Sequence, residues 1–157
     1  MCFGIFKKKA ITPVVEPVIE PVVEPIKPVV RKQVDGNYIY GILNAVKPAA
    51  THIYLSDNQY WLCSDADIET FLALDTTNKE KFQSELFDCD DFSYRLMGQL
   101  STPEWSGIAF GIVWTNLHAL NCFISETGKF YFIEPQNDKL QDKLEDWQGT
   151  EILFILF

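Results

Sequence analysis

The residues best suited to chemistry are one cysteine and three aspartates within the stretch 87–92, Phe-Asp-Cys-Asp-Asp-Phe. Asp88 is a good helix N-cap, which puts Cys89, Asp90 and Asp91 in the first helical turn. Helix amides lower the pKa of a thiol, and the resulting thiolate is the reactive form. The pattern therefore makes Cys89 a candidate nucleophile, although the local sequence alone favours the alternative. The alternative is a small buried hydrophobic residue, which is the usual state of a free cysteine.

The aspartates oppose this reactivity, because like charges raise the pKa of a neighbouring thiol. Either Cys89 is not a nucleophile, or a cation neutralises the acids. Carboxylate and amide oxygens suit a hard divalent ion such as Ca²⁺, and a bound ion reverses the local effect on the pKa. Gln136, Asn137 and Asp138 offer further oxygen donors just after an expected strand.

A general base and its orienting acid are available later in the chain. His118 opens an apolar segment, and Glu134 ends the next one, with a turn at 125–128 between them. If the two segments pair through that turn, Glu134 or its successors lie near the imidazole and orient it, as in catalytic triads. A buried structural histidine is the alternative for His118. His52, without an obvious partner, is interpreted as structural.

An oxyanion donor is also required by such chemistry. The backbone amide of Cys89 is the default, since it lies at the start of a helix. The side-chain amide of Gln83, six residues upstream, is a second candidate. Its alternative is a solvated residue in the polar run 78–85.

Three blocks taken together resemble a known family: residues 87–92, residues 118–121 (His-Ala-Leu-Asn) and residues 133–137 (Ile-Glu-Pro-Gln-Asn). They resemble the C-terminal peptidase domain of the Marasmius oreades agglutinin and the related small stand-alone domains of bacteria and phages. That family implies a papain-like fold and a calcium-dependent cysteine peptidase. The resemblance covers roughly residues 50–140.

The resemblance implies roles for individual residues: Cys89 as nucleophile, His118 as base and Glu134 as orienting acid. It implies a Ca²⁺ (or Mn²⁺) ion held by the following candidates: Asp90, Asp91, Gln136 and Asn137. The implied activity is a divalent-cation-dependent cysteine peptidase or amide hydrolase acting on a peptide or protein substrate. The alternative is an inactive papain-like metal-binding module with a structural or assembly role, as in a phage particle. Acyl transfer by the same triad, with an amine in place of water, is a third hypothesis.

The expected elements make an α+β fold, in which the helix that carries the cysteine packs on an antiparallel sheet. Helices are expected at 66–74, with Ser64 and Asp67 as a capping box, and at 89–100, with a weaker one at 139–146. Residues 38–43 fit either a helix or a strand. Strands are expected at 52–55, 60–63, 107–114, 118–124, 129–133 and 151–157, the first two as a hairpin.

Three parts are expected along the 157 residues: a docking peptide or tag at 1–10, a proline-rich linker at 11–33 and the folded domain at 34–157. Proline at every fourth residue of the linker excludes helix and sheet interior and predicts an extended spacer. Residues 1–10 combine apolar side chains with three lysines, so weak docking to a membrane or protein is an alternative to a frayed end.

Bulk composition narrows the classes of function. The net charge of −9 argues against nucleic acid as a partner. The chain has no apolar run of the roughly 18 residues that a transmembrane helix needs, and no signal peptide is expected. Four cysteines without a close pair favour reduced thiols. A cytoplasmic or virion-associated location follows as the expectation.

Overall fold

The computed structural model describes residues 26–29, 31–46 and 52–157. The expected docking peptide 1–10 and most of the linker 11–33 therefore lie outside the described residues. The first strand, β1 (Lys32–Asp35), begins two residues before the domain start expected at residue 34.

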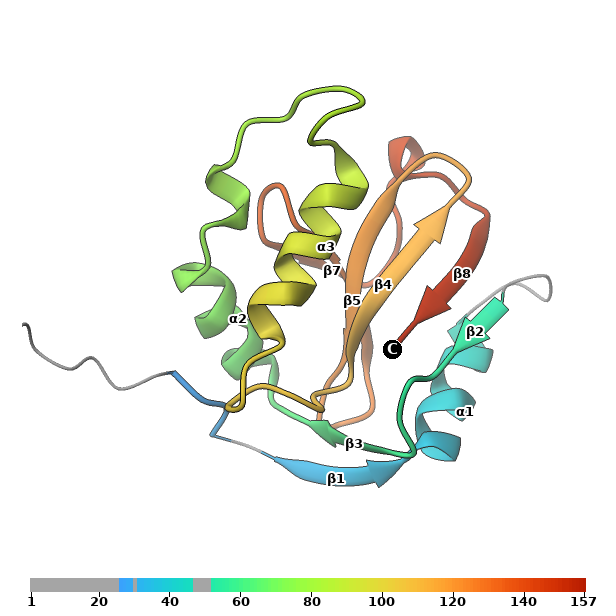
Figure 1. Ribbon diagram of the computed structural model, residues 1–157. Coiled ribbons are helices and arrows are strands. Elements are labelled where there is room, and N and C mark those ends of the chain that lie inside the picture. Colours follow the sequence, from blue (N-terminus) through green and yellow to red (C-terminus); the bar gives the residue numbers. More distant parts are fainter. Residues whose placement is uncertain (1–25, 30, 47–51) are drawn as a thin grey trace, which may run out of the picture.

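The described residues form a mixed α+β fold around a six-stranded sheet (Figure 1). Its strand order is β2-β8-β4-β5-β6-β7, and all neighbours are antiparallel except β2 and β8. The strands are β2 (His52–Tyr54), β4 (Phe110–Thr115), β5 (Ala119–Ile124), β6 (Phe130–Glu134), β7 (Lys139–Gln141) and β8 (Ile152–Leu156). A second, two-stranded sheet pairs β1 with β3 (Gln59–Leu62). The α+β class expected from the sequence is confirmed.

Helices cover both faces of the large sheet, because the strands present apolar side chains to each face. Helix α1 (Gly36–Val46) packs on one face through Ile39 and Leu43. Helices α2 (Asp65–Leu74) and α3 (Cys89–Leu100) lie on the other (Figure 1). None of the helices described has the length and apolar character needed to cross a membrane.

Helix α3 forms where the sequence predicted it, from Cys89 to Leu100. Asp88 is its N-cap, and the Asp91 carboxylate accepts a hydrogen bond from the Asp88 backbone N–H at 3.2 Å. The side-chain amide of Asn121, fully buried in β5, donates to the Ser93 carbonyl oxygen of α3 at 3.1 Å. The helix is thereby fixed to the centre of the sheet.

The predicted hairpin of β5 and β6 is also confirmed. The strands pair antiparallel, with Asn121 opposite Ile133, and the turn contains Gly128 at a φ of +82°. This register brings the residue before β5 close to the last residue of β6. The capping box of α2, formed by Ser64 and Asp67, is confirmed as well.

The expected hairpin of 52–55 with 60–63 is wrong. Both segments are strands, but β2 pairs in parallel with β8 at the far end of the chain, and β3 pairs with β1. The loop between β2 and β3 is bound to the C-terminal residue, since the Ser56 backbone N–H donates to the Phe157 carbonyl oxygen at 2.7 Å. Residues 38–43, left open between helix and strand, belong to α1.

The weak helix expected at 139–146 is wrong too. Lys139–Gln141 is the edge strand β7, and a short 3-10 helix, η2, follows at Asp146–Gln148. A helix would put Leu140 and Leu144 on one face. In the fold they pack on opposite sides of the sheet, Leu140 towards α2 and α3 and Leu144 towards α1, so no single helix face carries both.

Candidate active site

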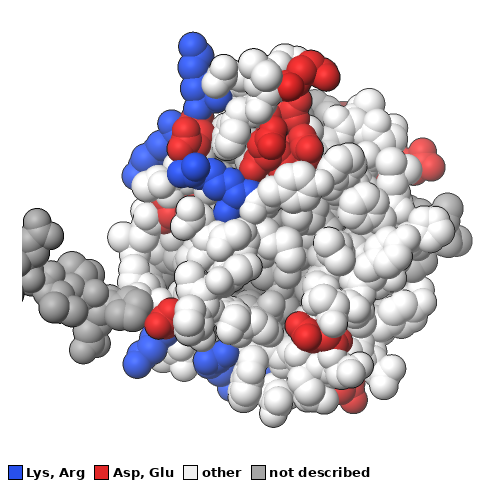
Figure 2. Space-filling model, in the orientation of Figure 1, with Lys and Arg blue, Asp and Glu red and all other residues white. Residues whose placement is uncertain are grey.

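A cleft with a volume of about 430 Å³ lies where α3 begins. It is lined by residues of the loop before α3, the first turn of α3, the loop before β5, the segment after β6 and η2: Phe82, Asp88, Cys89, Leu117, His118, Gln136 and Trp147. Figure 2 shows acidic side chains gathered near the top of the molecule and a largely uncharged centre. The residues that line the cleft thus supply a thiol, an imidazole, a carboxylate and apolar walls.

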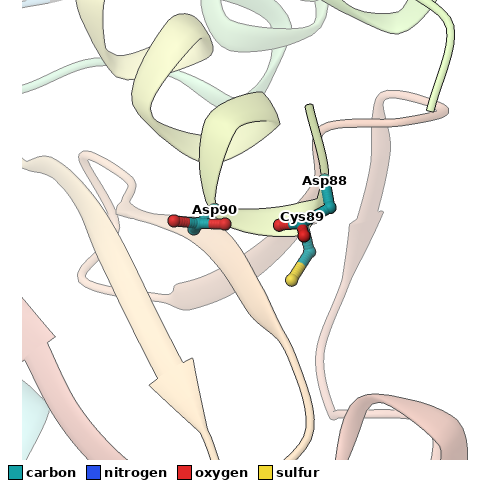
Figure 3. A group of neighbouring side chains, drawn as sticks. All are labelled: Asp88, Cys89 and Asp90. Carbon is teal, nitrogen blue, oxygen red and sulfur yellow. The ribbon is translucent and has the colours of Figure 1, made fainter. Parts of the chain in front are cut away.

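Cys89 is half-buried at the first position of α3, and Figure 3 shows its side chain extending away from the helix, beside Asp88 and Asp90. Burial raises the pKa of the Cys89 thiol above its ordinary value. The Ala119 backbone amide lowers this pKa, and the charges of Asp88 and Asp90 raise it further. The pKa of the thiol is therefore raised, as expected from the like charges, but burial contributes more to this shift than the charges do.

The acids of this turn have different surroundings. Oxygens of Asp88 and Asp90 and the sulfur of Cys89 all lie within 4.8 Å of one another (Figure 3). A hydrogen bond with Asp88 raises the pKa of the Asp90 carboxyl. Asp91 is used in the helix cap. Two carboxylates and a thiol do not match the roughly six to eight oxygen ligands that Ca²⁺ takes.

His118 and Glu134 are in direct contact. His118 Nε2 lies 2.8 Å from Glu134 Oε2, and both side chains are buried, with 6% and 1% of their surface exposed. The same carboxylate oxygen accepts a hydrogen bond from Gln148 Nε2 at 2.8 Å. The other oxygen, Oε1, accepts from the Gln136 backbone N–H at 3.3 Å. The carboxylate is thus held from three directions.

The imidazole is positioned by its own surroundings as well. The Thr115 hydroxyl accepts from the His118 backbone N–H at 2.9 Å and donates to the Gln148 carbonyl oxygen at 2.5 Å. The Trp147 ring lies with its centroid 4.9 Å from that of the His118 ring, tilted by 60°. Trp147 is itself half-exposed at the edge of the cleft.

The structure brings Cys89, His118 and Glu134 to one place, as the sequence analysis expected. It does not bring all the other candidates there. Gln83 is exposed, and its backbone closes a small loop with Phe87, while the neighbouring Phe82 lines the cleft.

Of the expected cation ligands in the third block, residues 133–137, Gln136 lines the cleft. Asn137 is exposed, and its Oδ1 accepts from the Lys139 backbone N–H at 3.1 Å. The Ca²⁺ or Mn²⁺ ion therefore stays a prediction.

Sequence reasoning missed Thr115, Trp147 and Gln148. Gln148 is fully buried, contacts Glu134 and lies in η2, outside the three blocks of the family resemblance. No local pattern distinguishes such a glutamine from a solvated one, since its role depends on a contact between segments distant in sequence.

Comparisons with known proteins give a fold but no family. No family model and no curated protein sequence matches the chain. A solved structure described as a complex of PSL1a with E64 matches with a TM-score of 0.69 and 22% identity, over 80% of this chain and 50% of that chain. The Polyporus squamosus lectin, bound to the human-type influenza-binding epitope Neu5Aca2-6Galb1-4GlcNAc, matches with a TM-score of 0.62 and 23% identity, over 80% and 49%.

This chain spans about half the length of these structures, and at such identities the similarity shows a shared fold alone. The chain therefore shares its fold with PSL1a and with the Polyporus squamosus lectin, and the finer resemblance stays a prediction. The papain-like arrangement is not established by it.

The comparisons overturn the expected function. The matched structures are described as a lectin and its complexes, and neither description names a peptidase or calcium. The expectation of a calcium-dependent cysteine peptidase or amide hydrolase is therefore wrong. The alternative of an inactive papain-like metal-binding component of a phage particle has no support either.

Proposed function

We propose that the cleft at the start of α3 is a covalent thiol site in which Cys89 accepts an acyl group and passes it to an amine. One observation carries the proposal: His118 lies in the same cleft as Cys89, and its Nε2 is hydrogen-bonded to Oε2 of the buried Glu134 at 2.8 Å. A paired imidazole and carboxylate beside a thiol is the arrangement that activates nucleophiles. A papain-like placement, with the cysteine on a helix and its partners on adjacent strands, is part of this proposal.

Hydrogen bonding supports the assignment of the proton on the imidazole. Gln148 Oε1 accepts from the Glu145 backbone N–H at 2.9 Å, so its Nε2 is the group that donates to Glu134. Glu134 Oε2 is then an acceptor, and His118 Nε2 is the nitrogen that carries the proton. The other nitrogen, Nδ1, keeps its lone pair and is free to take the proton of a thiol.

The reaction then balances in two steps. In the first, the proton of Cys89 passes to His118 Nδ1, the sulfur bonds to the acyl carbon, and the leaving group departs with that proton. In the second, a primary amine attacks the thioester and gives a proton to His118, which returns it to the sulfur as the C–S bond breaks. Glu134 stabilises the imidazolium in both steps but does not itself react.

The walls of the cleft indicate the class of each reactant. Phe82, Leu117 and Trp147 are exposed apolar side chains that suit an apolar acyl group. The carboxylates of Asp88 and Asp90 lie beside the sulfur and attract the amine in its protonated form, which gives its extra proton to solvent before the neutral amine attacks. An acyl donor with an apolar chain and an amine acceptor are therefore the proposed substrates.

The first experiment measures the reactivity of the thiol. Iodoacetamide labelling, mapped by mass spectrometry, should be faster at Cys89 than at the buried Cys63 and Cys122. His118→Ala should slow it by about tenfold or more, because a general base is lost. His52→Ala, at the other and exposed histidine, is the matched control. Equal labelling at Cys89, Cys63 and Cys122 would refute the nucleophile.

The second experiment separates transfer from hydrolysis. The chain is incubated with a small acyl ester and a primary amine, and the products are separated by chromatography. We expect an amide product that Cys89→Ser abolishes. Release of the free acid alone, at a rate that the amine does not change, would refute acyl transfer. E64, named in complex with PSL1a, serves as an additional probe of the cleft.

Glycan recognition is the second candidate, favoured by the complex of the Polyporus squamosus lectin with a sialylated epitope. Trp147, 53% exposed at the edge of the cleft, offers a ring face to a sugar, and Asp88 and Gln136 offer hydrogen bonds. Calorimetric titration with Neu5Aca2-6Galb1-4GlcNAc tests it. Binding that Trp147→Ala weakens supports this candidate, and the absence of binding removes it.

A further inference from the structure

A groove with a volume of about 250 Å³ lies between α2 and the end of α3, away from the candidate active site. Its apolar lining includes Phe71, Leu74 and Trp105. Leu74, the last residue of α2, is 57% exposed. A large side chain this exposed, next to further apolar surface, marks a place where another segment can pack.

The last residues of the proline-rich segment already occupy one end of this groove. Ile26 lines it, and the Ile26 carbonyl oxygen accepts a hydrogen bond from the Trp105 indole at 2.7 Å. The Trp105 ring is fixed against Phe71, with centroids 4.9 Å apart. An indole donating to the carbonyl of an extended proline-rich chain, within an aromatic groove, is the mode by which such chains are recognised.

The direction of the chain is set by two contacts with α2. The Val29 backbone N–H donates to Asp67 Oδ1 at 2.8 Å, in the first turn of α2, and Ile26 lies near Phe71, one turn later. Three extended residues cover about 9 Å and four helical residues about 6 Å. From Val29 to Ile26 the described chain therefore runs along α2 in the direction of Leu74, which also lines the groove.

We propose that residues 22–25, the last three residues of the final Pro-Val-Val-Glu repeat and the proline that follows it, bind in this groove of their own domain, with the Val23 side chain against Leu74. Pro21 and Pro25 bias their preceding residues to the extended conformation that the groove requires. The repeats further from the domain, at 13–20, keep the spacer role. The proposal is independent of the acyl-transfer chemistry.

Thermal unfolding of the full chain tests the proposal. Val23→Ser should lower the Tm by about 2–4 °C, because a buried apolar contact is lost. Val15→Ser is the matched control, since Val15 has the same place in the first repeat, and it should leave the Tm unchanged. In a Leu74→Ser background, Val23→Ser should have no further effect. Cross-relaxation between the methyl groups of Val23 and Leu74, measured by NMR, should be present.

Three results would overturn it. The first is a Tm that Val23→Ser leaves unchanged, together with no cross-relaxation between Val23 and Leu74. The second is a full additional loss from Val23→Ser in the Leu74→Ser background, which would place Val23 elsewhere. The third is a Tm that rises with protein concentration in the wild type but not in Val23→Ser, which would assign the groove to the segment of a second copy.

Discussion

Glu134→Gln tests the positioning of the imidazole with the smallest change in shape. Glu134 is 1% exposed, and its Oε2 accepts from both His118 Nε2 and Gln148 Nε2. An amide oxygen placed at the Oε2 position still accepts from both. The amide NH₂ then faces the Gln136 backbone N–H, which has lost its acceptor. The variant therefore keeps the packing but removes the negative charge and one hydrogen bond.

The magnitude follows from the lost charge. A hydrogen bond to a charged group contributes about 1.5–3 kcal/mol, against about 1 kcal/mol for a neutral pair. The imidazolium formed during the reaction loses roughly 1–2 kcal/mol of stabilisation on this basis, and each 1.4 kcal/mol is a factor of ten in rate. We expect alkylation of Cys89 to slow by about 5- to 30-fold, with less effect on folding.

The assay is the rate of iodoacetamide labelling at Cys89, with circular dichroism and Tm to verify the fold. Glu80→Gln is the matched control, because Glu80 is an exposed carboxylate that pairs with Arg95 outside the cleft. Labelling of a folded Glu134→Gln variant at the wild-type rate would refute the view that this carboxylate stabilises the imidazolium.

Three further predictions rest on separate features. Asp90→Asn should lower the pKa of the Cys89 thiol, because a like charge is removed. At pH values below this pKa the variant then has more thiolate, so iodoacetamide should label Cys89 severalfold faster than in the wild type. At pH values well above the pKa the two labelling rates should converge. Gly111→Ala should cost about 3 kcal/mol or more of unfolding free energy in urea titration, since a Cβ would lie 2.2 Å from the Leu156 carbonyl oxygen. Ser64→Ala should cost about 1 kcal/mol in the same measurement through the lost N-cap of α2, and no loss would contradict the capping role.

Features encoded by neighbouring residues were predictable from the sequence. The bounds of α3 follow from Asp88 as a cap and from apolar residues at helical spacing, and the β5–β6 hairpin follows from its turn. These two features bring Cys89, His118 and Glu134 together. The direction of the shift in the Cys89 pKa was also predictable, because the aspartates adjoin the thiol in the sequence.

Features that depend on distant segments were not predictable in this way. Nothing near His52 indicates that its strand pairs with β8, about a hundred residues later. Leu140 and Leu144 have helical spacing, yet the sheet places them on opposite sides. The function expected from the three blocks was wrong as well, because short motifs define which groups meet but not which molecule they act on.

The position of the site within the sheet determines how it responds to local opening of the structure. Both outer strands, β2 and β7, have three residues, and each is partly exposed. His118 adjoins β5, all of whose residues are buried, and Glu134 ends its neighbour β6. Edge strands fray at low free energy, whereas central strands open only with the whole domain. Backbone amides beside the imidazole should thus exchange hydrogen more slowly than those of β2, and the site should persist until global unfolding.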